Sequence, residues 1–444
     1  MKKISILSIL TLLVFSISMA ASTLSGSWRG VLAIGQYKMP IVFNFAGDGE
    51  SLKCTVDSPS QGVKGLPANI LYISSDSISV SCESVGATYS GRIAGNEITG
   101  IFRQMGVALP LTLSPEDSAV EHRPQTPKAP FPYTVIDTVF TSVDGTTLAG
   151  TLTLPILTGV AKAPAVVMIT GSGAQNRDEE ILEHKPFAVI ADYLARNGVA
   201  SFRYDDRGTA ASRGDFKTST TYTFKDDAAS ATNFVHTFPM IGKVGALGHS
   251  EGGTIAFMLA GEGKCDFVIS LAGMAVSGKE LEMEQNKQAL AGAKISDAER
   301  ENSLKLVDLY FDDIIAGKSD IDVDRIVKDN NLAVPDAIVA SIKQSSRNRI
   351  PWFDTFLTIV PAESLAKIKC PLLAINGDKD TQVSASSNLE VIKENVPQAD
   401  VRLMPGLNHL MQHAVTGAVS EYYDITETIS PEVLDIILAF SKAQ

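Results

Sequence analysis

The stretch VGALGHSEGGTIAFMLA at residues 244–260 decides the fold class of this chain. It opens with an apolar run typical of a buried strand, and Thr254–Ala260 continues in a pattern typical of a helix. Gly248 and Gly252 lie between the two, and glycine allows a strand and a helix to approach closely. The stretch therefore predicts a strand, a sharp turn and a helix, with Ser250 at the turn.

Ser250 has the surroundings that a nucleophilic serine requires. The G-x-S-x-G pattern between a strand and a helix lifts the serine hydroxyl clear of the sheet. The same turn directs the Glu251 N–H and the helix N-terminus toward a developing oxyanion. We therefore predict Ser250 as the nucleophile and the Glu251 N–H as one oxyanion donor.

A nucleophilic serine needs a base, and the base needs a carboxylate to hold its tautomer. His409 follows the predicted strand Val401–Met404, and Asp380 and Asp378 follow the predicted strand Leu372–Ile375. Because the carboxyl ends of parallel strands converge on one crevice, we expect His409 to be the base. We predict Asp380 as its carboxylate, because a turn can point it back toward the crevice, and Asp378 as a solvated turn residue.

A second oxyanion donor is expected from the loop after the predicted strand Ala165–Ile169. There the sequence reads Gly-Ser-Gly, which lets a backbone N–H approach the substrate. We predict the Ser172 N–H as the donor, with Gly173 next. In the same loop Arg177, paired with Asp178, is expected to shape the mouth of the substrate site.

From residue 133 onward the pattern alternates between strands and helices. It predicts an α/β fold with a doubly wound, mostly parallel, eight-stranded sheet, entered through an antiparallel hairpin. Residues 277–361 contain no strand candidate and predict a helical lid inserted between two strands. Trp352 and Phe353 near its end either line the substrate pocket or pack the lid onto the sheet.

The first part of the chain has a different organisation. Residues 1–20 carry two lysines, an apolar run and small residues, which is the pattern of a signal peptide, so we expect a secreted or periplasmic protein. Residues 21–113 show short alternating runs typical of a small antiparallel β barrel or sandwich. Residues 114–132 are rich in proline and predict an extended linker.

Composition excludes several classes of partner. The 444 residues carry 38 basic and 50 acidic side chains, a formal net charge of −12, and no run of Lys or Arg. We therefore expect no nucleic-acid partner, and no stable membrane anchor because no segment after residue 20 is long and apolar enough. The four cysteines lack zinc-type spacing, so we expect no metal. Cys54 and Cys82 are either core thiols or a disulfide, and the sequence leaves both open.

From about residue 133 to the C-terminus the chain resembles the α/β-hydrolase superfamily. More narrowly, it is similar to secreted bacterial esterases related to the dienelactone-hydrolase and prolyl-oligopeptidase-like branch. The segments that carry this resemblance are Gly171-Ser172-Gly173, Asn176-Arg177-Asp178, Arg203-Tyr204-Asp205-Asp206-Arg207-Gly208, Gly248-His249-Ser250-Glu251-Gly252-Gly253, Gly377-Asp378-Lys379-Asp380 and Pro405-Gly406-Leu407-Asn408-His409. The resemblance implies that Ser250, Asp380 and His409 are catalytic, in the superfamily's chain order, with no cofactor. Thr170 departs from the pattern, because many relatives have His there.

The expected activity is a serine carboxylesterase that hydrolyses small acyl or aryl esters through an acyl-enzyme intermediate. One alternative is a serine peptidase of the prolyl-oligopeptidase-like type. Those enzymes usually carry a large propeller domain, which residues 21–113 are too few to build. The other alternative is a ligand-binding protein, in which the β domain captures a ligand and the hydrolase fold is inert.

Overall fold

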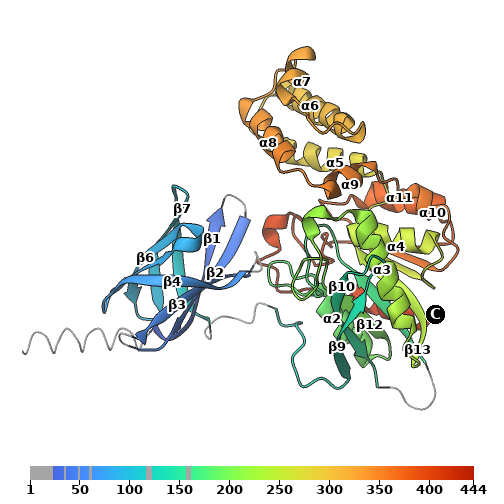
Figure 1. Cartoon of the computed structure of the whole chain (residues 1–444), viewed down its shortest axis with the longest axis horizontal. Coiled ribbons are helices and arrows are strands. Elements are labelled where there is room, and N and C mark those ends of the chain that lie inside the picture. The colour runs from blue at the N-terminus through green and yellow to red at the C-terminus, as the bar shows by residue number, and fades with distance from the viewer. Residues whose placement is uncertain (1–23, 35–36, 49–50, 60–62, 117–122, 157–161) are drawn as a thin grey trace, which may run out of the picture. The chain divides into compact units, whose positions relative to one another are not determined.

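The computed structural model describes residues 24–34, 37–48, 51–59, 63–116, 123–156 and 162–444 (Figure 1). The predicted signal peptide lies outside the described residues. The chain divides into two compact units. The first, the barrel domain, holds the N-terminal β strands together with Ile181–Glu183 and Tyr422–Thr426. The second, the α/β domain, holds the remainder.

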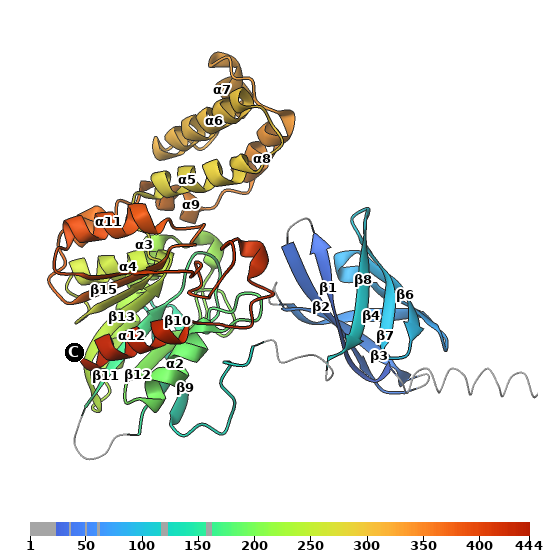
Figure 2. The same cartoon turned by 180° about the vertical axis from the view of Figure 1, so that it is seen from behind.

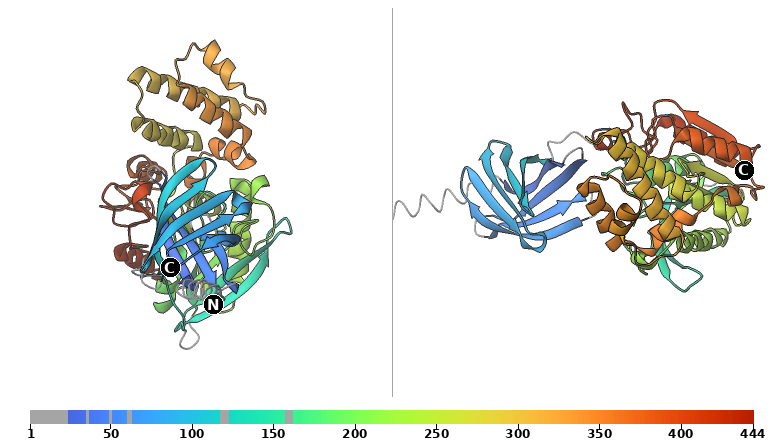
Figure 3. Two further views of the ribbon diagram at one scale, coloured as in Figure 1. Left: turned by 90° about the vertical axis from the view of Figure 1, so that its left-hand side faces the viewer. Right: turned by 90° about the horizontal axis from the view of Figure 1, so that it is seen from above.

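The barrel domain is a closed barrel in which each strand pairs with the next, seen from two further directions in Figure 3. Its strands are β1 (Gly26–Ile34), β2 (Tyr37–Ala46), β3 (Lys53–Ser58), β4 (Val63–Ile73), β5 (Ser77–Cys82), β6 (Ala87–Ala94), β7 (Glu97–Gln104) and β8 (Val107–Pro115), with a 3₁₀ turn, η3 (Glu83–Val85), before β6. The last strand closes on the first, with Trp28 opposite Pro115 and Arg29 opposite Ser114. Ser114 and Pro115, which the sequence placed in the linker, therefore belong to β8.

The barrel domain buries alternate side chains of its strands, as antiparallel strands with one wet face do. Burial alternates residue by residue along β5, for example. Cys54 and Cys82 both point into this core as free thiols, and burial raises the pKa of Cys54 to about 12. Of the two alternatives for these cysteines, the structure has core thiols.

The α/β domain is built on an eight-stranded sheet in the order β16-β15-β14-β13-β11-β12-β10-β9. Its strands are β9 (Thr134–Thr141), β10 (Thr147–Leu154), β11 (Ala163–Ile169), β12 (Ala200–Tyr204), β13 (Ile241–His249), β14 (Val268–Leu271), β15 (Leu372–Gly377) and β16 (Asp400–Met404). Strand β10 is antiparallel to β9 and β12, and the pairs from β12 through β16 are parallel. The prediction of a mostly parallel sheet entered through an antiparallel hairpin is confirmed.

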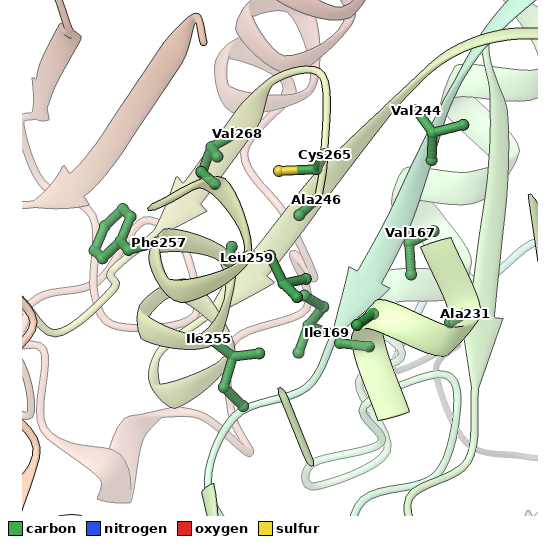
Figure 4. Packing of buried hydrophobic residues seen from close by; sticks show 14 of the residues in the cluster. Val167, Ile169, Ala231, Val244, Ala246, Ile255, Phe257, Leu259, Cys265 and Val268 are labelled. Carbon is green, nitrogen blue, oxygen red and sulfur yellow. The ribbon is translucent and has the colours of Figure 1, made fainter. Parts of the chain in front are cut away.

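Helices cover both faces of this sheet. One face carries α2 (Pro186–Arg196) and α12 (Pro431–Lys442), which lie side by side in Figure 2. The other carries α3 (Thr221–His236), α4 (Glu251–Gly261), α10 (Ala362–Leu365) and α11 (Ala385–Asn395). Two short 3₁₀ turns, η5 (Phe216–Thr218) and η6 (Val419–Glu421), lie in the connecting loops. Figure 4 shows how Leu259 of α4 packs against the strand residues Ile169 and Ala246. The sheet is therefore dry on both sides, which explains its continuous apolar strands.

A helical insert separates β14 from β15, as the sequence predicted. It consists of α5 (Gly278–Ala291), α6 (Asp297–Ile315), α7 (Val323–Asp329), α8 (Asp336–Arg347) and α9 (Pro351–Thr358). Capping boxes of Ser277 with Glu280 and of Ser296 with Glu299 begin α5 and α6. The insert has its own apolar core, which includes Phe311 and Leu306. No helix among the described residues has the length and apolar character needed to cross a bilayer.

The turn between β13 and α4 depends on glycine for close packing. A Cβ atom on Gly252 would lie 2.1 Å from the carbonyl oxygen of Ile169, and one on Gly248 would lie 2.0 Å from the carbonyl oxygen of Gly252. Both obstacles are backbone atoms, which cannot swing aside as a side chain can. The end of β11 and the start of α4 consequently touch through their main chains.

We expect Gly252→Ala to destabilise the protein by about 3 kcal/mol, because the added methyl group collides with the β11 backbone. The matched control is Gly292→Ala, where the added Cβ meets no atom closer than 3.9 Å and the φ angle of −84° suits alanine. Urea unfolding followed by circular dichroism measures both. Equal stability of the two variants would contradict the backbone contact at Gly252.

Candidate active site

Ser250 sits in a strained backbone conformation at the junction of β13 and α4. Its φ is +53° and its ψ is −121°, a region that non-glycine residues rarely adopt. Two hydrogen bonds hold it there, because its N–H donates to the Leu271 carbonyl at 2.9 Å and its carbonyl accepts from the Gly253 N–H at 2.9 Å. The strained turn predicted from the glycine pattern is therefore present, and Ser250 is at its apex.

His409 and Asp380 form a buried hydrogen-bonded pair. Nδ1 of His409 lies 2.8 Å from Oδ2 of Asp380, and both side chains are almost fully buried. The second carboxylate oxygen of Asp380 accepts from the N–H groups of Gln382 and Val383, each at 2.8 Å. These bonds fix the carboxylate of Asp380, and the carboxylate in turn orients the imidazole ring of His409. The Nε2 atom of the ring can then take up or give a proton. Asp378 is exposed, as predicted for a turn residue.

His249 connects the turn at Ser250 with the loop of His409. Its Nε2–H donates to the main-chain carbonyl of His409 at 2.9 Å, and the two imidazole rings have their centroids 4.7 Å apart. The candidate base is thus held against the residue that precedes the candidate nucleophile. The structure brings together the residues that the sequence predicted from separate strands.

Glu179 is the buried partner of His249. Its Oε1 lies 2.9 Å from Nδ1 of His249 and also accepts from the Gly171 N–H at 2.7 Å. Burial lowers the pKa of His249, but the charge and hydrogen bond of Glu179 and the bond to the His409 carbonyl outweigh it and raise the pKa overall. Both ring nitrogens face acceptors, which is the arrangement of a protonated imidazole.

The loop after β11 lies directly against Ser250. A Cβ on Gly171 would be 3.2 Å from the Ser250 Cβ. Asp206 braces this loop, accepting from the Thr170 hydroxyl and from the Gln175 N–H, each at 2.9 Å. Burial raises the pKa of Asp206 well above its usual range against these two hydrogen bonds. Thr170, the position that departs from the resemblance, therefore serves as a loop anchor.

Comparison with known proteins identifies the family. Residues 183–413, just over half of the chain, match the sequence model of the serine aminopeptidase S33 family of hydrolases (Hydrolase_4). The chain belongs to this family. It is 27% identical over 270 residues to esterase EstD of Thermotoga maritima, a match that spans 60% of this chain and 58% of EstD.

Solved structures also resemble this S33-family chain. The Pyrococcus furiosus esterase Pf2001 matches 70% of this chain and 91% of its own, with 16% identity and a TM-score of 0.43. Est1E of Butyrivibrio proteoclasticus, solved with ferulic acid, matches 69% of this chain and 100% of its own, with 17% identity and a TM-score of 0.42.

The carboxylate of Glu251 is a further buried group in this hydrolase. It accepts from the Thr221 hydroxyl at 2.5 Å and from the Trp352 Nε1–H at 2.9 and 3.0 Å. Burial raises the pKa of Glu251, opposed by hydrogen bonds from Thr221, Trp352 and the hydroxyl of Ser172. The sequence pattern predicted a role only for the N–H of Glu251. Its side chain joins the loop after β11 to the helical insert.

Trp352 and Phe353 take different positions. Trp352 packs against the sheet core and against the cluster that includes Met258 and Phe356, and it donates its indole N–H to Glu251. It therefore holds the insert beside the turn of Ser250. Phe353 packs inside the insert, with its ring centroid 5.8 Å from that of Phe311. Trp352 therefore packs the insert onto the sheet, which is one of the two alternatives, whereas Phe353 makes its contacts within the insert.

The predicted pairing of Arg177 with Asp178 is wrong. Arg177 makes two side-chain hydrogen bonds to Asp205, at 3.0 and 2.8 Å, and reaches Thr151 of β10 at 2.7 Å. Asp178 instead pairs with Arg203. Two parallel N–H donors match a carboxylate better than a single contact does, which explains why Asp205 wins. Arg177 therefore holds its loop to β10, the strand next to the edge strand β9.

Two buried acidic residues of the candidate site were not predicted from the sequence. Glu179 and the side chain of Glu251 carry no motif of their own, and their roles depend on long-range packing. Their signal was present only as acidic residues in otherwise buried surroundings.

Across the part of the chain that the structure describes, no group of three or more His, Cys, Asp or Glu side chains is placed to hold a metal ion.

We expect Glu179→Gln to destabilise the protein by about 3 kcal/mol at pH 6, because it breaks a buried charged pair. Since the folded-state pKa of His249 is raised, the stabilisation from this pair is complete below the usual histidine pKa of about 6.5 and is lost as pH rises through the raised value. The difference in unfolding free energy between wild type and variant should therefore shrink at pH 9.

Urea unfolding at the two pH values measures this difference. The matched control is Glu301→Gln, at an exposed position of α6, which should change stability little at either pH. A Glu179→Gln penalty that is the same at pH 6 and pH 9 would contradict the charged pair.

Proposed function

We propose that this protein is a serine carboxylesterase that hydrolyses small acyl or aryl esters through an acyl-enzyme intermediate. The observation that carries the proposal is the buried bond of 2.8 Å between His409 and Asp380, held beside the strained turn of Ser250. A serine beside a histidine that is hydrogen-bonded to a buried carboxylate provides the three residues of a catalytic triad. Membership of a hydrolase family and the similarity to an esterase, EstD, support it.

In the proposed first step, Nε2 of His409 takes the proton of the Ser250 hydroxyl as its oxygen attacks the ester carbonyl. Asp380 stabilises the imidazolium that forms. The negative charge on the tetrahedral intermediate faces the N–H groups of Glu251 and Ser172, with Gly173 as the next donor. The imidazolium then gives its proton to the leaving alcohol, and the acyl group stays on Ser250.

In the second step, water replaces the alcohol. His409 takes a proton from the water molecule, whose oxygen attacks the acyl carbonyl, and returns the proton to Ser250 as the acid leaves. The whole cycle needs no cofactor. The network of Glu179 and His249 contributes by holding the three participating loops in fixed positions, since small misplacements cost large factors in rate.

The helical insert is proposed as the lid of this site. Trp352, on α9, bonds to the carboxylate of the residue that follows Ser250. A lid fastened this close to the nucleophile can limit the size of the acyl group or alcohol. Arg177 is no longer proposed to touch the substrate, because Asp205 and Thr151 occupy its donors.

A serine peptidase is the second candidate function, because the matching family is described as serine aminopeptidases. Amide and ester cleavage share the nucleophile, base and oxyanion donors. The two activities differ in the leaving group, so they are separated by substrates and not by the geometry around Ser250. An inert fold is disfavoured, because His409 keeps its carboxylate partner.

We also propose that the protein is exported, either into the medium or into the periplasm. The support is the leader pattern of residues 1–20, with its two lysines ahead of an apolar run. Mass spectrometry of the protein recovered from the producing cells would find the N-terminus just after Ala20. An intact Met1 N-terminus in the mature protein would contradict export by cleavage.

The decisive experiment measures kcat/KM on p-nitrophenyl acetate, butyrate and octanoate beside alanine and proline p-nitroanilides. We expect turnover of the esters, fastest with short acyl chains, and Ser250→Ala to lower kcat by about 10⁶. The control is Ser345→Ala, at an exposed position of α8, which should leave kcat unchanged. Retained turnover in Ser250→Ala would sink the assignment. Anilide cleavage without ester preference would move the protein to the peptidases.

A further inference from the structure

The barrel domain contains an apolar cavity of about 520 Å³. This volume lies within the range of about 300–1,000 Å³ that is typical of small-molecule sites. The cavity is lined by side chains near the C-terminal ends of β1, β3, β5 and β7 and near the starts of the strands that follow them, which together form one end of the barrel. Eight-stranded barrels are wide enough either to be filled by side chains or to hold one small ligand.

The opposite end of the barrel is filled. Trp28 donates its indole N–H to the Leu24 carbonyl at 2.9 Å, and both residues are buried. Ile98 and Leu113, which face each other across β7 and β8, are fully buried near the same end. None of these four residues lines the cavity. The barrel is therefore a cup with one closed end.

The mouth of the cup carries exposed apolar side chains. Ile34, Val85, Met105 and Val107 line the cavity and are also exposed to solvent, with Met105 93% exposed. Each belongs to a strand end or connection at the open end. Exposed apolar side chains that cluster around a cavity are typical of a ligand-binding site, because leaving them in contact with water is unfavourable.

The lining is chemically uniform. Among the residues that the structure describes, it includes no Asp, Glu, Lys or Arg side chain. Its larger polar groups bond to the barrel itself, because the Tyr89 hydroxyl donates to the carbonyls of Ile98 and Leu111, at 2.8 and 3.1 Å, and the Gln104 amide donates to the Val85 carbonyl at 2.9 Å. A charged ligand group placed inside would be desolvated without a counter-charge, which is costly.

We propose that the barrel domain binds one amphipathic molecule with a single apolar tail, such as a long-chain fatty acid, with the tail inside the cup and the polar head at the mouth. The apolar lining recognises the tail. The lack of charged lining residues keeps the head in water, next to the exposed rim. Every described residue of the lining belongs to the barrel domain, so the proposal does not rest on the α/β domain or on the esterase function.

Fluorescence titration of the full-length protein with N-phenyl-1-naphthylamine tests the proposal, because this neutral probe brightens in apolar surroundings. The titration uses the Ser250→Ala protein, so that catalysis plays no part. We expect saturation at one probe per chain and displacement by hexadecanoic acid at concentrations at least tenfold lower than by hexanoic acid. Absence of saturable binding would overturn the site, and equal displacement by the two acids would overturn the tail.

Variants locate the bound probe. Leu109→Trp adds bulk to a half-buried side chain of the lining and should weaken binding at least tenfold. Its matched control is Ala108→Trp, at the adjacent exposed position outside the lining, which should leave binding unchanged. Met105→Asn trims the rim at a turn residue with φ +49°, which asparagine tolerates, and should weaken binding severalfold without affecting folding.

Thermal unfolding confirms that each variant is folded before its binding is compared. If Leu109→Trp does not fold, Met105→Asn alone decides the outcome. Unchanged affinity in the folded variants would place the probe outside the cup and overturn the proposal.

Discussion

The buried pair of Glu179 and His249 is the interaction on which the candidate active site depends. Glu179 bonds to the Gly171 N–H of the loop after β11, and His249 bonds to the main chain of the His409 loop. Three segments that are far apart in the sequence are therefore fixed by two side chains. A buried carboxylate and a buried imidazolium are each unfavourable without a partner. Moving either side chain away would leave the other buried and unpaired. The pair therefore fixes the positions of the two loops that lie beside Ser250.

A second buried carboxylate extends this arrangement outward. Glu251 follows Ser250 and receives hydrogen bonds from Thr221 and from Trp352 of the insert. The turn that carries Ser250 is thus fastened from the sheet side by His249 and from the insert side by Glu251. One short segment is therefore held on both sides of the serine, through the His409 loop by His249 and through the insert by Glu251.

The sequence predicted the candidate catalytic residues because each follows an apolar strand, and parallel strands end at one edge. What it could not predict were choices made by tertiary packing. Arg177 had Asp178 beside it in the sequence, yet pairs with Asp205 across the loop. Closure of the barrel depends on Trp28 meeting Pro115, a long-range pairing that alternation alone does not specify. Pro115 indicated a linker, although proline is tolerated at a strand end.

The two domains differ in how they treat buried polar groups, and this difference bears on their roles. Around Ser250 the α/β domain buries Glu179, Glu251, Asp206 and His249, each held by hydrogen bonds. Such groups are retained where charge must be stabilised or directed. The barrel cavity has no charged side chain among its described lining residues, and its Tyr89 and Gln104 donors bond to the barrel's own backbone. A cavity of that kind cannot assist proton transfer or stabilise an oxyanion, but it can take up an apolar chain from water. The chemistry of the chain therefore belongs to the α/β domain, and the barrel is suited to holding a molecule unchanged.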